Sequence, residues 1–415
     1  MVAEVTMSDQ KTKVFFIADK WCGGNRISGL SEWEGNLWAS LKVLDLAEVD
    51  VFHLDDYHRL WKQRGDVALL EKIEEFQPDI ICLITNKMPG SDVNVPEWST
   101  FDRIKNVLKI PLIAIWGDLE HPEQLNITKA MLPYVKYHVA TASAAIVARI
   151  RHPEKYLYMW VPKNPLVFFD SGQQRDIDLS YIGSPKKDRL ARVKYLVSHG
   201  VSVIHTGGER GGVHLKTMDY AELFRKSKIT LSFSRAVLCH VINARPFEAM
   251  LCGAMVLEEE SFETLKLYTP FVDYVPFVSN RDMLEKARYY LAHDSERETI
   301  ARNGLLKTST HYSAERFWAL VISRALDRDT LDTWGQTNPS SENADLSRLP
   351  SWRRYKLRAL DKICSTPASH TIYSLAKKSV RPFYWRKPIR HLCERILPRS
   401  IFHWVLKVKR KFLGL

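Results

Sequence analysis

An acidic and a basic side chain stand three residues apart at the start of one segment in the second half of the chain. Arg245 and Glu248 occupy the first turn of a predicted helix, which Gly253 ends and the strand Ala254–Glu259 follows. In a parallel sheet, ligands lie outside the carboxyl ends of the strands, near helix N-termini. A carboxylate there can accept hydrogen bonds from two ribose hydroxyls, and an arginine can pair with a diphosphate. The alternative is that Glu248 only favours the helix dipole and Arg245 is a surface charge.

A second group of polar residues follows a predicted strand in the first half. The segment Trp116–Pro122 offers three candidate general bases, namely Asp118, Glu120 and His121. We expect Asp118 to be the base, and the alternative is that it caps the following turn. Two further acids, Glu32 and Glu34, are alternatives for the same role.

Two acidic pairs, Asp176/Asp178 and Asp55/Asp56, have the composition of metal ligands. An Asp-x-Asp triplet often arises by chance, and this one precedes a predicted strand instead of following it, so we expect no metal at either pair. The six cysteines lie far apart and lack the spacing of a zinc site or of a disulfide framework. We therefore expect no disulfides and a cytoplasmic location.

The elements that position these residues alternate as in an α/β sheet. Apolar runs rich in β-branched or aromatic residues predict parallel strands at Val14–Ala18, Asp50–Leu54, Asp79–Thr85, Pro111–Trp116 and Tyr137–Thr141. Helical spacing predicts helices at Glu34–Leu44 and Asp66–Phe76. The loop Trp21–Asn25 has two glycines but no Gly-x-Gly-x-x-Gly pattern, which argues against a dinucleotide cofactor.

A second series of elements begins after a crossover at Tyr156–Asp170. Its predicted strands are Asp178–Gly183, Val201–Gly208, Lys228–Ser234 and Ala254–Glu259. Its predicted helices are Arg189–His199, Tyr220–Lys226, Arg245–Leu251, Asp282–His293 and Tyr312–Leu326. The chain therefore predicts two Rossmann-like halves that meet near residue 170.

Length and charge agree with this division. A chain of 415 residues exceeds one ordinary domain, and 45% hydrophobic residues exclude a disordered protein. The net charge of +12 comes from residues 351–415, which carry +15, so residues 1–350 carry −3. We predict five parts: a flexible N-terminus (1–12), a first domain (13–170), a second domain (171–327), a linker (328–350) and a basic, mainly helical tail (351–415).

The segment Arg245–Leu257 resembles the nucleotide-sugar helix of GT-B glycosyltransferases, in particular the CgeB-like group of spore-maturation proteins. Three other segments resemble this family in the same order along the chain: Asp178–Ser184, Ser227–Arg235 and Val275–Gly304. The resemblance covers roughly residues 160–325. It implies a GT-B fold, in which two Rossmann-like domains face each other across a cleft, with the acceptor on the first and a nucleotide sugar on the second.

The resemblance also implies the residues of a donor site. Glu248 would hold the ribose, while Arg235 and Arg245 would balance the charge of the departing diphosphate. Gly183 and Ser184 would let backbone N–H groups approach the donor phosphates, and Gly207 is a further candidate residue of the donor site. GT-B enzymes support the diphosphate with basic side chains and helix dipoles, so we expect no obligatory metal or other cofactor.

One position departs from the wider family. Many retaining members carry a second Glu eight residues before the ribose-binding one, and this chain has His240 there. An acidic contact to the sugar is therefore missing, and the stereochemistry of transfer does not carry over. His240 is a candidate site residue near the sugar, and the alternative is a structural histidine.

These observations predict a glycosyltransferase that moves a sugar from a nucleotide-diphosphate sugar to a glycan or lipid-linked acceptor, in the synthesis of cell-surface polysaccharide or glycoconjugate. The alternative is a catalytically inactive GT-B protein that binds a nucleotide or serves as a scaffold, which the replacement of an acid by His240 suggests.

The basic tail ends in a segment with apolar and cationic faces at helical spacing, Ile401–Phe412. Aromatic anchors and cations suit the surface of an anionic membrane, which would place the protein on its cytosolic face. The alternatives are a helix docked on the first domain and a nucleic-acid-binding tail, for which no module is recognisable.

Overall fold

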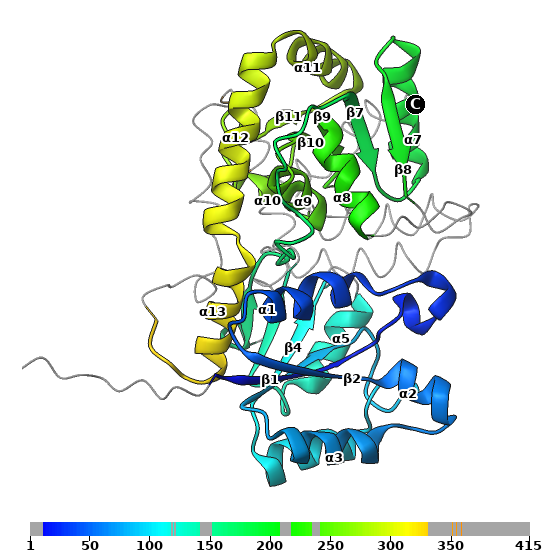
Figure 1. Ribbon diagram of the computed structural model, residues 1–415, viewed down its shortest axis with the longest axis vertical. Coiled ribbons are helices and arrows are strands. Elements are labelled where there is room, and N and C mark those ends of the chain that lie inside the picture. Colours follow the sequence, from blue (N-terminus) through cyan, green and yellow to red (C-terminus); the bar gives the residue numbers. More distant parts are fainter. Residues whose placement is uncertain are drawn as a thin grey trace, which may run out of the picture.

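A computed structural model describes most of the first 330 residues. The described residues are 11–117, 119, 122–141, 152–207, 217–234, 241–330, 351, 354 and 358. They form two parallel β-sheets with helices around them, one sheet in each half of the chain (Figure 1). The two α/β units and their order along the chain confirm this part of the fold class predicted from the sequence, whereas the predicted helical tail lies almost wholly outside the described residues.

The first sheet has the strand order β2-β1-β3-β4-β5-β6, and every neighbouring pair is parallel. Its strands are β1 (Lys13–Ala18), β2 (Glu48–His53), β3 (Ile80–Ile84), β4 (Leu112–Trp116), β5 (Tyr137–Ala140) and β6 (Tyr156–Tyr158). Its helices are α1 (Ala39–Val43), α2 (Leu54–Trp61), α3 (Asp66–Phe76), α4 (Trp98–Arg103) and α5 (Pro122–Met131), and the π-helical turns η3 (Glu34–Trp38) and η4 (Ile104–Leu108) adjoin α1 and α4.

The second sheet has the order β11-β10-β9-β7-β8 and is also parallel. Its strands are β7 (Ile177–Ile182), β8 (Val203–Thr206), β9 (Ser227–Ser232), β10 (Met255–Glu259) and β11 (Val275–Phe277). The helices that follow β7 in the chain are α7 (Lys187–Ser198), α8 (Thr217–Lys226), α9 (Ala244–Leu251), α10 (Phe262–Leu265), α11 (Asn280–Ala292), α12 (Asp294–His311) and α13 (Ala314–Ala325).

Strand β1 shows how sequence pattern becomes core. Phe15 and Ile17 belong to the cluster that contains α3, whereas Val14 and Phe16 belong to the cluster that contains α1 and α13. All four side chains are fully buried, since a parallel strand carries helices on both faces. This is why the buried strands appear in the sequence as continuous apolar runs.

Helix α13 connects the two halves physically. It follows the long helix α12, which lies along the second unit, and reaches the first unit beside α1 (Figure 1). The Trp318 ring packs edge-on against Phe16 at 5.6 Å between centroids, and its Nε1 donates to Ser40 Oγ at 2.9 Å. Although α13 follows the second sheet in the chain, its apolar face therefore completes the core of the first.

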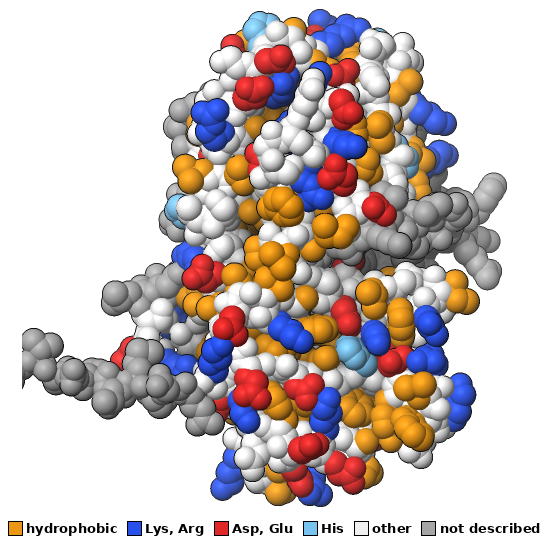
Figure 2. All heavy atoms as spheres, viewed as in Figure 1, with side chains coloured by type: hydrophobic (Ala, Val, Ile, Leu, Met, Phe, Trp, Pro, Cys, Tyr) orange, Lys and Arg blue, Asp and Glu red, His pale blue; other side chains and the backbone are white. Residues whose placement is uncertain are grey.

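The crossover segment makes further contacts between the units. Trp160 Nε1 donates to the Ser313 carbonyl at 3.1 Å, and Asn164 Nδ2 donates to the Gly35 carbonyl at 3.2 Å. Acidic and basic side chains are interspersed over the visible face of both units (Figure 2). Within the described residues, no helix is long and apolar enough to cross a membrane.

The predicted parts of the chain remain predictions as to their boundaries. The N-terminal segment 1–10, almost all of the linker after residue 330 and nearly the whole basic tail lie outside the described residues. Strands β6 and β11 and the helix α12 were not predicted individually. The two strands are three residues long, and the apolar residues of α12 have little helical periodicity, so neither gives a clear sequence signal.

Candidate functional site

Two glycines lie next to each other at the carboxyl ends of β7 and β8. Gly183 follows β7, and its N–H donates to the Thr206 carbonyl at 2.9 Å. Gly207 follows β8 with φ +103°, and a Cβ built there would lie 3.1 Å from the Gly183 nitrogen. The positive φ and this close approach both require glycine. The predicted phosphate-facing glycines are thus adjacent in space, although the Gly183 N–H already has a partner.

Arg245 lies directly against Gly183. A Cβ on Gly183 would come within 3.0 Å of the Arg245 Cζ and Nε, so the guanidinium packs on the glycine face. Asn243 caps α9 and its side chain accepts the Arg245 backbone N–H at 3.0 Å, which holds the arginine in the first turn. Arg245 Nε is buried and has no hydrogen-bond partner in the described structure.

The surroundings of Arg245 favour its charged form. Burial alone lowers the pKa of Arg245, but the nearby oxygens of Tyr220, Glu248, Tyr181 and Glu32 together raise that pKa above its ordinary value. A half-buried cation with an unpartnered N–H, packed on glycine backbone, is suited to bind an anionic group such as a phosphate.

Glu248 lies one turn further along α9 and is closed to solvent. Its Oε1 accepts from Lys163 Nζ at 2.5 Å, and its Oε2 accepts from the Tyr220 hydroxyl. The side chains of Lys163 and Glu248 are 2% and 3% exposed, so this is a fully buried ion pair. In this arrangement both carboxylate oxygens are occupied by protein groups and not directed at a ligand.

Tyr220 completes this cluster from α8. Burial, followed by the charge of Glu248, raises the pKa of Tyr220 well above its ordinary value, so the phenol stays protonated and acts as a donor. The sequence analysis did not single out Tyr220 or Lys163. A lysine between two prolines in the otherwise apolar crossover is the signal that could have identified Lys163.

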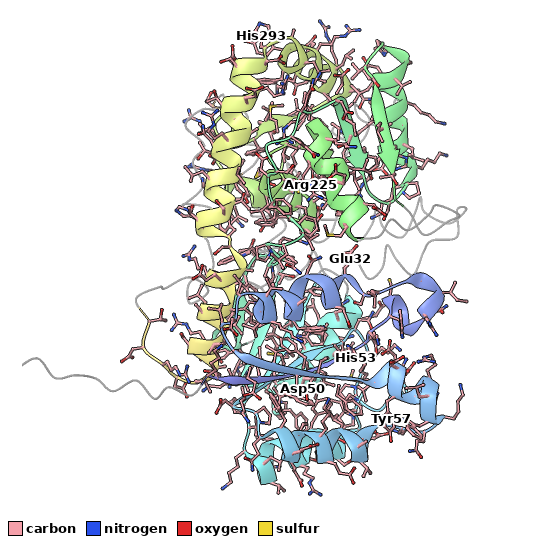
Figure 3. All side chains as sticks on the ribbon, in the orientation of Figure 1. Glu32, Asp50, His53, Tyr57, Arg225 and His293 are labelled. Atoms are coloured by element: carbon pink, nitrogen blue, oxygen red, sulfur yellow. The ribbon has the colours of Figure 1, made fainter. Side chains whose placement is uncertain are left out.

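One acidic residue of the first unit faces this cluster. Glu32 is exposed and lies between the two units (Figure 3). Its charge raises the pKa values of both Tyr220 and Arg245, which places it close to these residues of the second unit. Glu32 is therefore the predicted acidic candidate that the fold brings to the donor-side residues.

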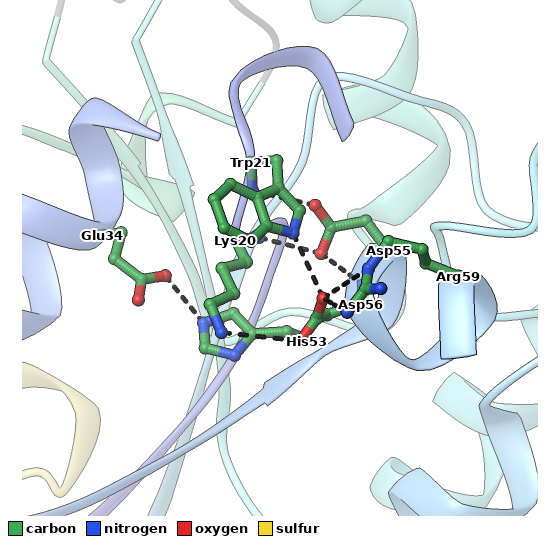
Figure 4. Close-up of polar contacts among 7 residues, drawn as sticks. All are labelled: Lys20, Trp21, Glu34, His53, Asp55, Asp56 and Arg59. Carbon is green, nitrogen blue, oxygen red and sulfur yellow. Dashed lines mark hydrogen bonds and ion pairs between the residues drawn. The ribbon is translucent and has the colours of Figure 1, made fainter. Parts of the chain in front are cut away.

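A second set of polar residues lies at the carboxyl ends of β1 and β2. Glu34, on η3, is in hydrogen-bond contact with His53, with 2.8 Å between Oε2 and Nε2. Asp55 accepts the backbone N–H groups of Lys20 and Trp21, each at 2.9 Å, and Asp56 accepts from the Trp21 indole at 3.2 Å (Figure 4). These contacts fix the loop after β1 on the start of α2.

The other predicted site residues have different fates. Four of them, Asp118, His121, Arg235 and His240, lie outside the described residues and stay predictions. The Ser184 carbonyl accepts from the Tyr181 hydroxyl at 2.8 Å, which orders the turn after Gly183. In the described part of the chain, no group of three His, Cys, Asp or Glu side chains is arranged to hold a metal ion.

Part of the chain matches a known protein family. Residues 183–322, which include both glycines and all of α9, match the family model described as glycosyl transferase-like. The chain carries a glycosyltransferase domain. No curated protein sequence matches the chain.

Solved structures extend the likeness to both units. HepE from Anabaena, in complex with UDP-glucose, is 14% identical, with 75% of this chain and 99% of that chain covered and a TM-score of 0.52. An α-glucosyltransferase bound to UDP-glucose and DNA is 10% identical, with 76% and 99% covered and a TM-score of 0.57. Sucrose-phosphate synthase from Thermosynechococcus elongatus is 10% identical, with 75% and 99% covered and a TM-score of 0.50. At these identities the likeness concerns the fold, and the two units have the GT-B fold.

Proposed function

We propose that this glycosyltransferase takes a sugar from a nucleotide-diphosphate sugar and transfers it to a glycan or lipid-linked acceptor. The observation that carries the proposal is the packing of Arg245 on Gly183, which in turn lies against Gly207 at the carboxyl edge of the second sheet. This is the edge at which parallel α/β sheets bind nucleotides.

The chemistry of that edge suits a diphosphate leaving group. When the bond from the anomeric carbon to the diphosphate breaks, negative charge develops on the diphosphate, and a fixed cation stabilises it. Arg245 is half-buried and charged, and its buried Nε–H has no partner in the described structure, so it requires little rearrangement to donate to a phosphate oxygen. No metal is needed in this scheme, and the residues of α9 and the glycine turns supply the contacts.

The ribose contact proposed for Glu248 requires a rearrangement. Lys163 and Tyr220 occupy both oxygens of this carboxylate, so a ribose could reach it only if at least one of these contacts opens. Until then Glu248 acts on the donor site indirectly, by orienting Tyr220 and by raising the pKa of Arg245. Donor binding that opens this cluster would link the second unit to the crossover segment that carries Lys163.

The ligands of the similar structures suggest the first donor to test. HepE and the α-glucosyltransferase both bind UDP-glucose in their solved structures. We therefore propose a UDP-sugar as donor, and a cell-surface polysaccharide or glycoconjugate as the destination of the sugar. The location proposed for the protein is the cytoplasm or the cytosolic face of a membrane, with the basic tail 351–415 as the contact.

The test is calorimetric titration with UDP and a panel of nucleotide sugars, combined with detection of released nucleoside diphosphate. We expect micromolar binding of at least one nucleotide sugar and its slow hydrolysis in water. Binding without any turnover, with glycan and lipid-linked acceptors present, would support the inactive scaffold instead. Absence of nucleotide binding would exclude both functions.

A further inference from the structure

The first unit contains a buried carboxylate oxygen that has no hydrogen-bond partner among the described residues. Asp19 directly follows β1 and is partly buried, with its Oδ1 shielded from solvent and unpartnered in the described structure. The neighbouring Asp55 differs, because both of its oxygens accept backbone N–H groups. A buried carboxylate oxygen without a donor lowers stability, so its presence calls for an explanation, and active sites are where such groups are retained.

Charged groups from three elements surround Asp19. They are His53 at the end of β2, Asp55 at the start of α2, and Lys87 and Asp92 in the loop after β3. Burial, followed by repulsion from Asp55, raises the pKa of Asp19 to about 7, against smaller opposing effects of Lys87 and His53. Both cations have partners of their own, since Lys87 pairs with Asp92 at 3.1 Å and His53 with Glu34 at 2.8 Å.

The backbone links Asp19 to the loop that faces the second unit. The Ser31 N–H donates to the Lys20 carbonyl at 2.9 Å, so the two ends of the loop after β1 are closed against each other. Lys20 is the residue after Asp19, and Ser31 precedes Glu32, which lies between the units and acts on Arg245 and Tyr220. Asp19 and Glu32 therefore flank the two closed ends of one loop, and Glu32 faces Arg245 and Tyr220.

We propose that Asp19 is the general base that accepts the proton of the acceptor hydroxyl. The inference rests on the proposed function and deepens it. The acceptor oxygen forms a bond to the anomeric carbon of the donor sugar, and its proton moves to the Asp19 carboxylate. The bond from the anomeric carbon to the diphosphate breaks, and its electron pair leaves with the nucleoside diphosphate. A base that serves the acceptor in this way corresponds to transfer with inversion of the anomeric configuration.

The test uses the full-length protein and UDP-glucose, with water as the acceptor. The variants are Asp19→Asn, which keeps the shape of the side chain, and Glu75→Gln on the exposed face of α3 as a matched control. We expect Asp19→Asn to lower kcat for UDP release by about 100-fold or more, while the Kd for UDP stays within about twofold. Glu75→Gln should change neither value.

Two further readouts separate a base from a structural role. In the wild type, kcat should rise with pH through about 7 as Asp19 loses its proton, and this limb should be absent in Asp19→Asn. Proton NMR of the first product should show β-glucose. An Asp19→Asn enzyme with unchanged kcat, a retained pH limb or an initial α-glucose product would each overturn the inference. If one of these results is found while the wild type binds UDP and hydrolyses UDP-glucose, the proposed function still holds. Failure of the wild type to bind any nucleotide overturns the proposed function.

Discussion

Lys163 and Glu248 form a buried ion pair that joins the crossover segment to α9, with 2.5 Å between Nζ and Oε1. The pair also involves Tyr220, which donates to the second oxygen of Glu248. Because both charges are removed from water, each depends on the other for compensation. The crossover that links the two units is therefore anchored inside the second unit, beneath the helix that carries Arg245.

Removal of the lysine charge should destabilise the fold. Lys163→Met leaves Glu248 buried without its cation, and we expect a loss of about 3–5 kcal/mol in the free energy of unfolding, measured by urea denaturation. The double variant Lys163→Met/Glu248→Gln has no uncompensated charge and should recover much of this loss. If the single and double variants are equally unstable, the ion pair is not the cause.

Gly207→Ala should impair both stability and donor binding. The added Cβ would lie 3.1 Å from the Gly183 nitrogen in a backbone with φ +103°, so the turn that faces the donor must shift. We expect about 1–3 kcal/mol of destabilisation and a lower affinity for UDP in titration calorimetry. Gly200→Ala is the control, because Gly200 also has positive φ, at +83°, but open space around its Cβ position. Its affinity for UDP should equal that of the wild type.

Arg245→Lys should weaken nucleotide binding although it keeps the charge. A lysine cannot reproduce the planar guanidinium that packs on Gly183, nor its Nε–H. We expect the Kd for UDP to rise by roughly 10-fold or more, equivalent to about 1.4 kcal/mol. Arg288→Lys, at an exposed position on α11, serves as the control. An unchanged Kd in Arg245→Lys would remove Arg245 from the donor site.

Glu258 should make folding stability depend on pH. It is fully buried at the end of β10, accepts from the Ser234 hydroxyl at 2.8 Å, and burial raises its pKa from 4.5 to about 7. The folded state therefore binds this proton more tightly than the unfolded chain, so the contribution is complete below pH 4.5 and is lost as pH rises through about 7. The loss amounts to roughly 3 kcal/mol.

Glu258→Gln isolates this contribution. The amide does not ionise, so the variant should not lose this stability. The free energy of unfolding of the variant should therefore rise relative to that of the wild type as pH increases from about 5 to about 8. Urea titrations at these two pH values measure the difference between the two proteins. A difference that does not change with pH would show that Glu258 has an ordinary pKa in the folded protein.

Several elements of the fold followed from local pattern. The helix predicted at Asp66–Phe76 has these bounds in the structure, and the apolar run of β4 is buried along its whole length. The turn glycines and the polar first turn of α9 were also recognisable, because each reflects a local backbone or charge requirement. Local signals of this kind need only residues that are near in the chain.

The sequence by itself determined the two α/β units, their order, and the residues Gly183, Gly207 and Arg245 as a candidate phosphate-binding set. Only the tertiary structure showed that Glu248 is closed by Lys163, 85 residues earlier in the chain, and that α13 returns to pack Trp318 on Phe16. It also showed the unpartnered carboxylate of Asp19. The physical reason is that burial and pairing depend on strand order and on contacts between distant segments, and neither property is encoded in the spacing of neighbouring residues.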